Sequence, residues 1–330
     1  MHDWLIATWY GGGRRGRWLQ PLAWLFGGLV VMRRAAYRCR LLRRYRSPRP
    51  VVVIGNLSVG GTGKTPFVLW LASELAARGL RVGIASRGYR GTGGQARRVT
   101  EADDALRAGD EAVLLHRRLR VPLAVGARRV EAVRLLEPEC ELILCDDGLQ
   151  HYALERDVEI AVVDGVKGLG NGRLLPAGPL REPRTRLDEV DAVVVHGTGF
   201  DWPGGLCMRL VPSAAVALAD GARRPLTAFA GHRVDAIAAI GNPERFFAML
   251  REYGLQVDEH ALPDHATIAP ESFRGAVTQP VLMTEKDAVK CQVRPRNAWY
   301  VEVEARVDGP AVAGLLDRIT RLARAGQKGN

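Results

Sequence analysis

A glycine-rich loop between an apolar strand and a helix constrains this chain more than any other feature of its sequence. The β-branched run Val51–Ile54 predicts a short strand that is buried on both faces. The loop that follows includes Gly60–Thr65, with the sequence GGTGKT, and residues 66–80 carry apolar side chains at helical spacing. A strand, a glycine-rich loop and a helix in this order form a P-loop, which binds the phosphates of a nucleoside triphosphate.

Each residue type in this loop has a defined part in holding phosphate. Glycines let the backbone bend so that several N–H groups point at one anion, and the helix that follows adds its positive N-terminal end. We expect Lys64 to reach the outer phosphates and the Thr65 hydroxyl to ligate Mg²⁺. The general pattern has glycine where this chain has Ser58. The predicted ATP-binding residues are Ser58, Val59, Gly60, Gly61, Thr62, Gly63, Lys64 and Thr65.

Apolar strands and helical stretches alternate after the P-loop. This alternation is typical of a doubly wound, mainly parallel α/β sheet like that of P-loop NTPases. The expected strands of this part are residues 81–85, 121–125, 142–145, 160–163 and 192–195.

The strand and helix pattern starts again after about residue 205, which predicts a second, smaller α/β lobe. The strands expected there are residues 226–230, 236–240, 281–284 and 299–303, and the helices are 243–253 and 310–324. The predicted domains are a basic amphipathic membrane-associating helix region at 1–50, a P-loop kinase core at 51–210 and a smaller C-terminal domain at 211–330.

The positive charge of the chain is concentrated at its N-terminus. The whole chain of 330 residues has a formal net charge of +11. Residues 1–50 hold eleven Arg, one Asp and no Lys or Glu, so this arm carries 11 − 1 = +10 and the rest of the chain only +1. Such an arm can meet an anionic membrane or nucleic acid.

The apolar residues of the arm favour the membrane. Trp and Leu are frequent in it, and the run Trp18–Met32 contains Pro21, Gly27 and Gly28. This run is shorter than the roughly 20 residues of a spanning helix. We therefore expect an interfacial helix with apolar groups in the acyl boundary and Arg at the headgroups. The alternative is an ordinary helix packed on the body of the protein with an arginine-rich outer face.

Two adjacent carboxylates supply the second part of a Mg²⁺ site. Asp146 and Asp147 follow the apolar strand at 142–145, and open α/β sheets bind their ligands at such strand ends. Phosphoryl transfer at a P-loop needs an acid here to organise the metal ion. The predicted metal ligands are Thr65, Asp146 and Asp147. Asp164 also ends a predicted strand, but a turn is the favoured interpretation for it.

Several motifs in a fixed order resemble those of one enzyme family. They begin with the loop Gly55–Pro66 and span about residues 50–290. The others are SRGY at 86–89, GDE at 109–111, DDGLQH at 146–151, LLPAGPLREP at 174–183, GNP at 241–243, PDH at 263–265 and TEKD at 284–287. Together they resemble the tetraacyldisaccharide 4'-kinases, the lipid A 4'-kinases of Gram-negative bacteria.

This resemblance implies a reaction and a set of roles. The reaction is transfer of the γ-phosphoryl of ATP to the 4'-hydroxyl of an acylated glucosamine disaccharide 1-phosphate, in a cleft between two domains. The implied base on the sugar hydroxyl is Asp110, paired with His265, and Lys64 completes the catalytic set. The substrate-binding residues expected by the resemblance are Arg87, Glu111, Arg129, Gln150, His151 and Glu182. Lys286 and Asp287 are expected at the domain interface.

The same resemblance implies where the enzyme works and with what. A tetraacylated disaccharide hardly leaves a bilayer, so we expect peripheral association with the anionic cytoplasmic face of the inner membrane. We expect no nucleic-acid partner and no obligate protein partner. A regulatory ATPase is disfavoured because Ser58 stands where dimerising ATPases of the deviant Walker type have Lys, and a GTPase because the chain has no N-K-x-D motif.

Overall fold

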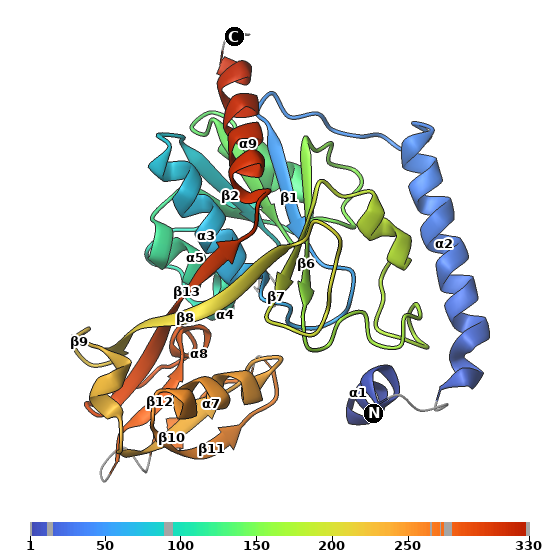
Figure 1. Cartoon of the computed structure of the whole chain (residues 1–330). Helices are drawn as coiled ribbons and strands as arrows, with labels where there is room; N and C mark the ends of the chain where they lie inside the picture. Colours follow the sequence, from blue (N-terminus) through green and yellow to red (C-terminus); the bar gives the residue numbers. More distant parts are fainter. Residues whose placement is uncertain are drawn as a thin grey trace.

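The computed structural model describes residues 2–11, 16–88, 95–264, 266–270, 272–273 and 279–327. Thirteen strands of this part form a single mixed, mainly parallel sheet. Its order is β11-β10-β12-β13-β8-β7-β6-β1-β5-β2-β4-β3, and β9 pairs with β8. The sheet therefore runs without a break from the core that carries the P-loop into the smaller lobe (Figure 1).

The core is the part of the sheet around β1 (Val51–Gly55), which is buried along its whole length. Its parallel neighbours are β5 (Leu142–Asp146) and β6 (Val158–Asp164). The outer core strands are β2 (Val82–Ser86), β4 (Leu123–Val125), β3 (Arg97–Arg98) and β7 (Ala192–His196). Each predicted core strand is present, with bounds that differ by at most two residues.

Helices cover both faces of this core because alternate side chains of β1 point to opposite sides. Val52 and Ile54 belong to the cluster that holds α3 (Lys64–Ala77), α5 (Asp110–Leu119) and α9 (Val312–Gln327). Val51 and Val53 belong to the opposite cluster, with α6 (Arg129–Leu136). The short helices of the core are α4 (Ala105–Ala108) and η2 (Arg184–Asp188).

The smaller lobe is joined to the core by two long antiparallel strands, β8 (Leu206–Ala217) and β13 (Ala298–Asp308). The first part of β8 pairs with β7 of the core, while the first part of β13 pairs with β12 of the lobe. Other elements of the lobe are β9 (Arg223–Arg224), β10 (Arg233–Ala238), β11 (Gln256–Ala261), β12 (Val281–Thr284), α7 (Pro243–Glu252) and α8 (Glu285–Ala288). The predicted boundary at 210/211 falls inside β8.

One strand of this lobe was predicted wrongly. Residues 226–230 form the 3₁₀-helix η3 (Leu226–Phe229) and not a strand. Leu226 and Phe229 are three residues apart, so in a 3₁₀-helix both side chains point the same way, and both are buried in the core of the lobe. Apolar composition alone cannot distinguish such a turn from a short strand.

The N-terminal arm forms α1 (His2–Tyr10), η1 (Arg17–Leu19) and α2 (Gln20–Arg38), and α2 lies along the edge of the core (Figure 1). Leu19 and Ala23 are buried against Leu174 and Ala177. Within the described ranges, no helix has both the length and the apolar character needed to cross a membrane.

Candidate active site between the two lobes

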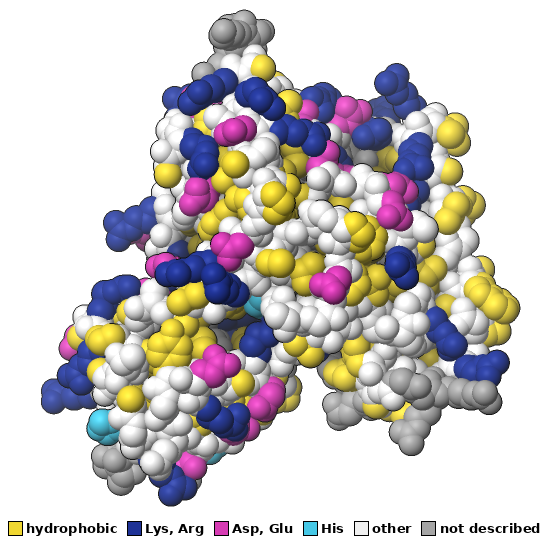
Figure 2. Space-filling model, in the orientation of Figure 1, with side chains coloured by type: hydrophobic (Ala, Val, Ile, Leu, Met, Phe, Trp, Pro, Cys, Tyr) yellow, Lys and Arg dark blue, Asp and Glu magenta, His cyan; other side chains and the backbone are white. Residues whose placement is uncertain are grey.

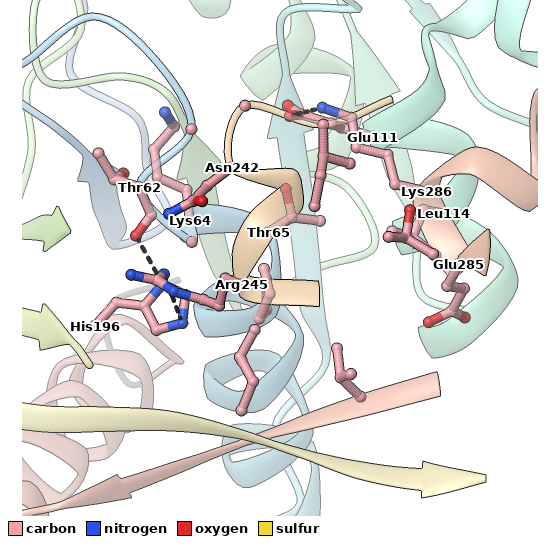
Figure 3. Close-up of a pocket in the computed structure, with 18 of the residues that line it drawn as sticks. Thr62, Lys64, Thr65, Glu111, Leu114, His196, Asn242, Arg245, Glu285 and Lys286 are labelled. Atoms are coloured by element: carbon pink, nitrogen blue, oxygen red, sulfur yellow. Dashed lines mark hydrogen bonds and ion pairs between the residues drawn. The ribbon is translucent and has the colours of Figure 1, made fainter. Parts of the chain in front are cut away.

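A cavity of about 790 Å³ is lined by both the P-loop and the smaller lobe. The core lines it with Val59–Thr65, the ends of β2 and β5 and the first turn of α5. The smaller lobe adds the loop before α7, the α7 helix itself and the start of α8. Figure 3 shows Lys64, Thr65, Asn242 and Arg245 in the middle of the view, with Glu111, Glu285 and Lys286 to their right.

The P-loop has the bent backbone that its glycines allow. Gly60 and Gly63 have φ values of +113° and +89°, which residues with a side chain rarely adopt. Gly63 is also the N-terminal cap of α3, so the loop leads directly into the positive end of a helix. This geometry is suited to an anion with several oxygens.

A buried asparagine braces the loop. The side-chain nitrogen of Asn56 donates to the carbonyl oxygens of Ser58 (2.7 Å) and Gly60 (3.3 Å), and its oxygen accepts from Lys64 Nζ at 3.1 Å. Lys64 Nζ also lies 3.4 Å from Asp147 Oδ1. Asn56 therefore fixes the loop and its lysine together, a role that the sequence analysis did not assign.

The two adjacent carboxylates at the end of β5 differ in their surroundings. Asp146 is buried, and its Oδ2 accepts from Ser86 Oγ at 3.3 Å. Burial raises the pKa of Asp146 to about 7, and the charges of Glu111 and Asp147 add to this rise. Burial also acts on Asp147, but the positive charges of Lys64 and Arg181 outweigh it and lower its pKa to about 2.

A second group of charges lies where α5 meets α8. Lys286 Nζ is 3.0 Å from Glu111 Oε1, 3.8 Å from Asp110 Oδ2 and 4.0 Å from Asp264 Oδ1. Burial lowers the pKa of Lys286, but the charges of Glu111, Asp110 and Asp264 outweigh it, so the net shift is upward. Lys286 comes from the smaller lobe and Asp110 and Glu111 from the core, so this contact joins the two.

Comparison with known proteins identifies the chain. The family model described as tetraacyldisaccharide-1-P 4'-kinase matches residues 15–321. The chain is 47% identical over 324 residues to the tetraacyldisaccharide 4'-kinase of Methylobacillus flagellatus, covering 97% of this chain and 96% of that protein. It is 48% identical over 322 residues to that of Azotobacter vinelandii, covering 96% of each chain. The chain belongs to the tetraacyldisaccharide 4'-kinase family. Its activity is that of a tetraacyldisaccharide 4'-kinase in lipid A biosynthesis.

A solved structure of the same family has the same fold. The crystal structure of LpxK from Aquifex aeolicus in complex with ATP superimposes with a TM-score of 0.76 at 29% identity. The match covers 93% of this 4'-kinase and 99% of the Aquifex chain.

Many of the residues predicted for the site of this 4'-kinase line the cavity. They are Val59, Gly60, Gly61, Thr62, Gly63, Lys64, Thr65, Arg87, Asp110, Glu111, Asp146 and Asp147. His265 is outside the described residues. The roles assigned to all of these residues stay predictions.

Other predicted site residues of the 4'-kinase are not part of the described cavity lining. They are Ser58, Arg129, Gln150, His151 and Glu182. Arg129 is buried, and its guanidinium donates to the carbonyl oxygens of Gly126 (2.6 Å) and Asp146 (3.4 Å). These contacts hold the backbone that carries the Asp146 carboxylate.

Glu182 lies beneath the P-loop. It is 1% exposed and accepts hydrogen bonds from Gln150 Nε2 at 2.8 Å and from the Tyr152 hydroxyl at 2.5 Å. Gln150 Nε2 also donates to the carbonyl oxygen of Asn56 at 3.2 Å. Gln150 therefore contacts the segment that leads into the P-loop, whereas Glu182 contacts neighbouring side chains. The neighbouring His151 is half-buried, and burial lowers its pKa to about 4.

Two residues that reach the P-loop from its other side were missed. His196 ends β7, and Arg245 lies in the first turn of α7. Asp164 also contacts Arg245, in addition to forming the predicted turn through hydrogen bonds from the amides of Val166 and Lys167. His196 could have been found from its place at a strand end, as Asp146 was. Arg245 has no such feature in the sequence.

Proposed function

We propose that this 4'-kinase transfers the γ-phosphoryl of ATP to the 4'-hydroxyl of a tetraacylated glucosamine disaccharide 1-phosphate, in the cavity between its lobes. One observation carries the proposal: the phosphate-binding loop and the Asp110–Glu111 pair face the same cavity. The product is the 4'-phosphorylated lipid A precursor.

The ATP phosphates are assigned to the P-loop. The left-handed glycines, the N-terminus of α3 and the ammonium of Lys64 converge there. The ATP bound to the related Aquifex protein supports the same nucleotide for this chain. Lys64 would exchange its contact with Asp147 for the outer phosphates, whose negative charge is greater.

The residues at the end of β5 suit a Mg²⁺ ion. The Oδ1 atom of Asp146 is buried and has no hydrogen-bond partner among the described residues. The described ranges hold no group of three His, Cys, Asp or Glu side chains that would form a metal cage, and Mg²⁺ at a P-loop is typically held by few protein oxygens, phosphates and water. We assign it to Thr65, Asp146 and Asp147. When bound, the ion would neutralise charge on the transferring phosphoryl group.

Asp110 is assigned the role of base. It is buried at the start of α5, and Glu111 N donates to its Oδ1 at 2.9 Å. The sugar hydroxyl would give its proton to Asp110 while its oxygen bonds to the γ-phosphorus. The bond from that phosphorus to the bridging oxygen breaks, and ADP leaves. Arg87 and the family-derived His265 are proposed to assist on the acceptor side.

The N-terminal arm is assigned to the membrane. Apolar side chains stand out from η1 and α2, including Trp18 at 69%, Trp24 at 70% and Leu25 at 63% exposure. Figure 2 shows such side chains interspersed with basic ones along the edge of the molecule formed by α2. Exposed Trp and Leu beside Arg favour binding in the plane of an anionic interface. We propose peripheral association with the cytoplasmic face of the inner membrane.

An assay with purified protein tests the reaction. Labelled ATP, Mg²⁺ and a detergent-dispersed tetraacyldisaccharide 1-phosphate are incubated with wild type and with Lys64→Ala. We expect 4'-phosphorylation by wild type and a loss of about 10²–10³-fold in the variant, since one charge-stabilising donor is removed. Phosphate on another position, or an undiminished rate in Lys64→Ala, would contradict the proposal.

Vesicle binding tests the arm separately. We expect the triple variant Trp18→Ser, Trp24→Ser, Leu25→Ser to sediment less with phosphatidylglycerol vesicles, while its activity on detergent-dispersed substrate is retained. Leu106→Ser is the matched control, because Leu106 is 63% exposed but lies on α4. Equal sedimentation of both variants would refute the assignment.

A further inference from the structure

Arg245 links the smaller lobe to two strand ends of the core. Its Nη2 donates to Asp164 Oδ1 at 3.1 Å, at the end of β6. Its Nη1 lies 2.8 Å from Nδ1 and 3.2 Å from Nε2 of His196, at the end of β7. Arg245, Asp164 and His196 form what we call the Arg245 cluster. The Arg245 side chain is 27% exposed and lines the cavity.

His196 connects this cluster to the P-loop. Its Nδ1 lies 3.3 Å from the carbonyl oxygen of Thr62. A Cβ atom at Gly63 would come within 2.3 Å of the same nitrogen, so the ring is packed directly on the loop. Figure 3 shows Arg245 against His196 and the dashed contact from that ring to Thr62. Any displacement of the ring would therefore move the Thr62–Gly63 peptide.

The His196 ring is neutral in this setting. A guanidinium only donates hydrogen bonds, so Nε2 is the ring nitrogen without a proton, and Nδ1 keeps its proton and donates it to the carbonyl oxygen of Thr62. Burial lowers the pKa of His196 to about 4, and the charge of Arg245 contributes to the fall. The negative charge that balances Arg245 is the buried Asp164.

A second contact fastens the same part of the lobe. Lys167 Nζ donates to the carbonyl oxygen of Gly241 at 2.9 Å. A Cβ atom at Gly241 would come within 3.1 Å of Gly61 N, so the two backbones face each other closely. The loop before α7 therefore meets the P-loop directly at Gly61, while Arg245 of α7 reaches Thr62–Gly63 through His196 of the core.

The strand order indicates which end of the nucleotide this cluster affects. Asp146 and Ser86 belong to β5 and β2, on one side of β1, while Asp164 and His196 belong to β6 and β7 on the other. The proposed metal ion and acceptor lie on the β5 side. The rest of ATP must then extend toward the β6 and β7 side, which is the side of the Arg245 cluster.

We propose that Arg245 is a positioning residue for ATP: through His196 it fixes the Thr62–Gly63 peptide of the P-loop and couples that loop to the smaller lobe. The inference rests on the proposed ATP site. On this proposal, the affinity for ATP depends on a residue of the smaller lobe, whereas the affinity for the lipid acceptor does not depend on that residue.

The test compares steady-state constants for both substrates in wild type, Arg245→Ala and Arg245→Lys. We expect Arg245→Ala to raise KM for ATP about tenfold, which corresponds to the loss of one hydrogen bond to a charged group. The KM for the disaccharide is expected to change less than about twofold. Lys keeps a positive charge beside Asp164 and is expected to recover part of the loss. His196→Asn is expected to show the same selectivity for ATP.

Arg251→Ala is the matched control. Arg251 lies on the same helix, is 47% exposed and pairs with Glu244 and Glu259. The inference is overturned if Arg245→Ala and Arg251→Ala have the same KM for ATP. It is also overturned if Arg245→Ala raises KM for ATP and KM for the disaccharide equally. Should Arg245→Ala fail to fold by circular dichroism, Arg245→Lys and His196→Asn decide by the same criterion. Absence of ATP-dependent phosphorylation in wild type would instead refute the proposed function.

Discussion

The two sides of the cavity are built in different ways. On the core side, the site residues are presented by backbone turns at strand ends: the P-loop after β1 and the carboxylates at the end of β5. On the side of the smaller lobe, two long side chains, Lys286 and Arg245, reach across the cavity to charged or polar partners. Figure 3 shows both sides together.

The core side of the site therefore depends on local backbone geometry, whereas the side of the smaller lobe depends on how the two lobes come together. Backbone turns form as soon as the strand and helix beside them form, so the core side carries its own geometry. Contacts between charged side chains of the two lobes exist only when the lobes are together, and each charged group loses hydration to make them. We therefore expect changes on the core side to affect chemistry, and changes on the lobe side to affect stability and substrate binding as well.

The largest effect is expected from Asp110→Asn, which removes the proposed base and keeps the shape of the side chain. The rate of phosphoryl transfer should fall about 10²–10⁴-fold, while binding of a fluorescent ATP analogue stays near that of wild type. The control is Asp104→Asn, because Asp104 is exposed and caps α4 through the amide of Arg107. A near-normal rate in Asp110→Asn would remove this residue from the mechanism.

An intermediate effect is expected from Lys286→Met, which keeps most of the side-chain volume but leaves the neighbouring carboxylates without their shared cation. Breaking a buried ion pair costs about 3–5 kcal/mol of unfolding free energy, and we expect the lower end because water reaches part of this site. Urea denaturation measures it. In the exposed Arg233–Asp258 pair, Arg233→Ala should change stability little. Equal losses of unfolding free energy in the two variants would show that the Lys286 contact contributes no more to stability than an exposed ion pair.

The smallest effect concerns pH and Glu285, which contacts Arg118 of α5 at 2.9 Å. Burial and then Glu302 raise the pKa of Glu285 from 4.5 to about 7, against the opposing charge of Arg118. The folded state therefore keeps a proton that the unfolded state has lost between these two values, so this group's contribution to stability falls as pH rises from 4.5 to 7.

Glu285→Gln removes this dependence. The stability of the variant relative to wild type should rise by about 2–3 kcal/mol between pH 4.5 and pH 8, since each unit of pKa shift corresponds to about 1.4 kcal/mol, and denaturation at several pH values measures it. Glu131→Gln is a control on α6, where Glu131 is half-buried and pairs with the exposed Arg128. A difference that stays constant with pH would show that Glu285 is ionised throughout the range.

Much of the core could be predicted from local patterns. Each predicted core strand is present within two residues, because a buried parallel strand is a continuous apolar run and the pattern depends only on neighbours in sequence. The smaller lobe was harder. The segment 226–230 has the composition of a strand and forms η3, and β8 is twelve residues long with polar and apolar positions mixed because it serves both lobes.

The site divides in the same way. Motif matching found Lys64, Asp110 and Asp146, which all line the cavity. It could not show that Arg129 and Glu182 face the backbone and buried side chains beneath the site, since a motif does not tell which way a side chain points. It also missed Arg245, whose partners are 49 and 81 residues away in the chain.

By itself, the sequence determined that this chain handles phosphate at a P-loop, that acids at the end of a parallel strand accompany it, and that a basic, tryptophan-rich arm precedes the core. These features depend on residues close together in the chain. Only the tertiary structure decided that the sheet continues from core to lobe, that Lys286 meets Glu111, and that Arg245 reaches the P-loop through His196. The reason is physical: such contacts join residues that are brought together only when the pairing of the long strands β8 and β13 fixes one lobe against the other.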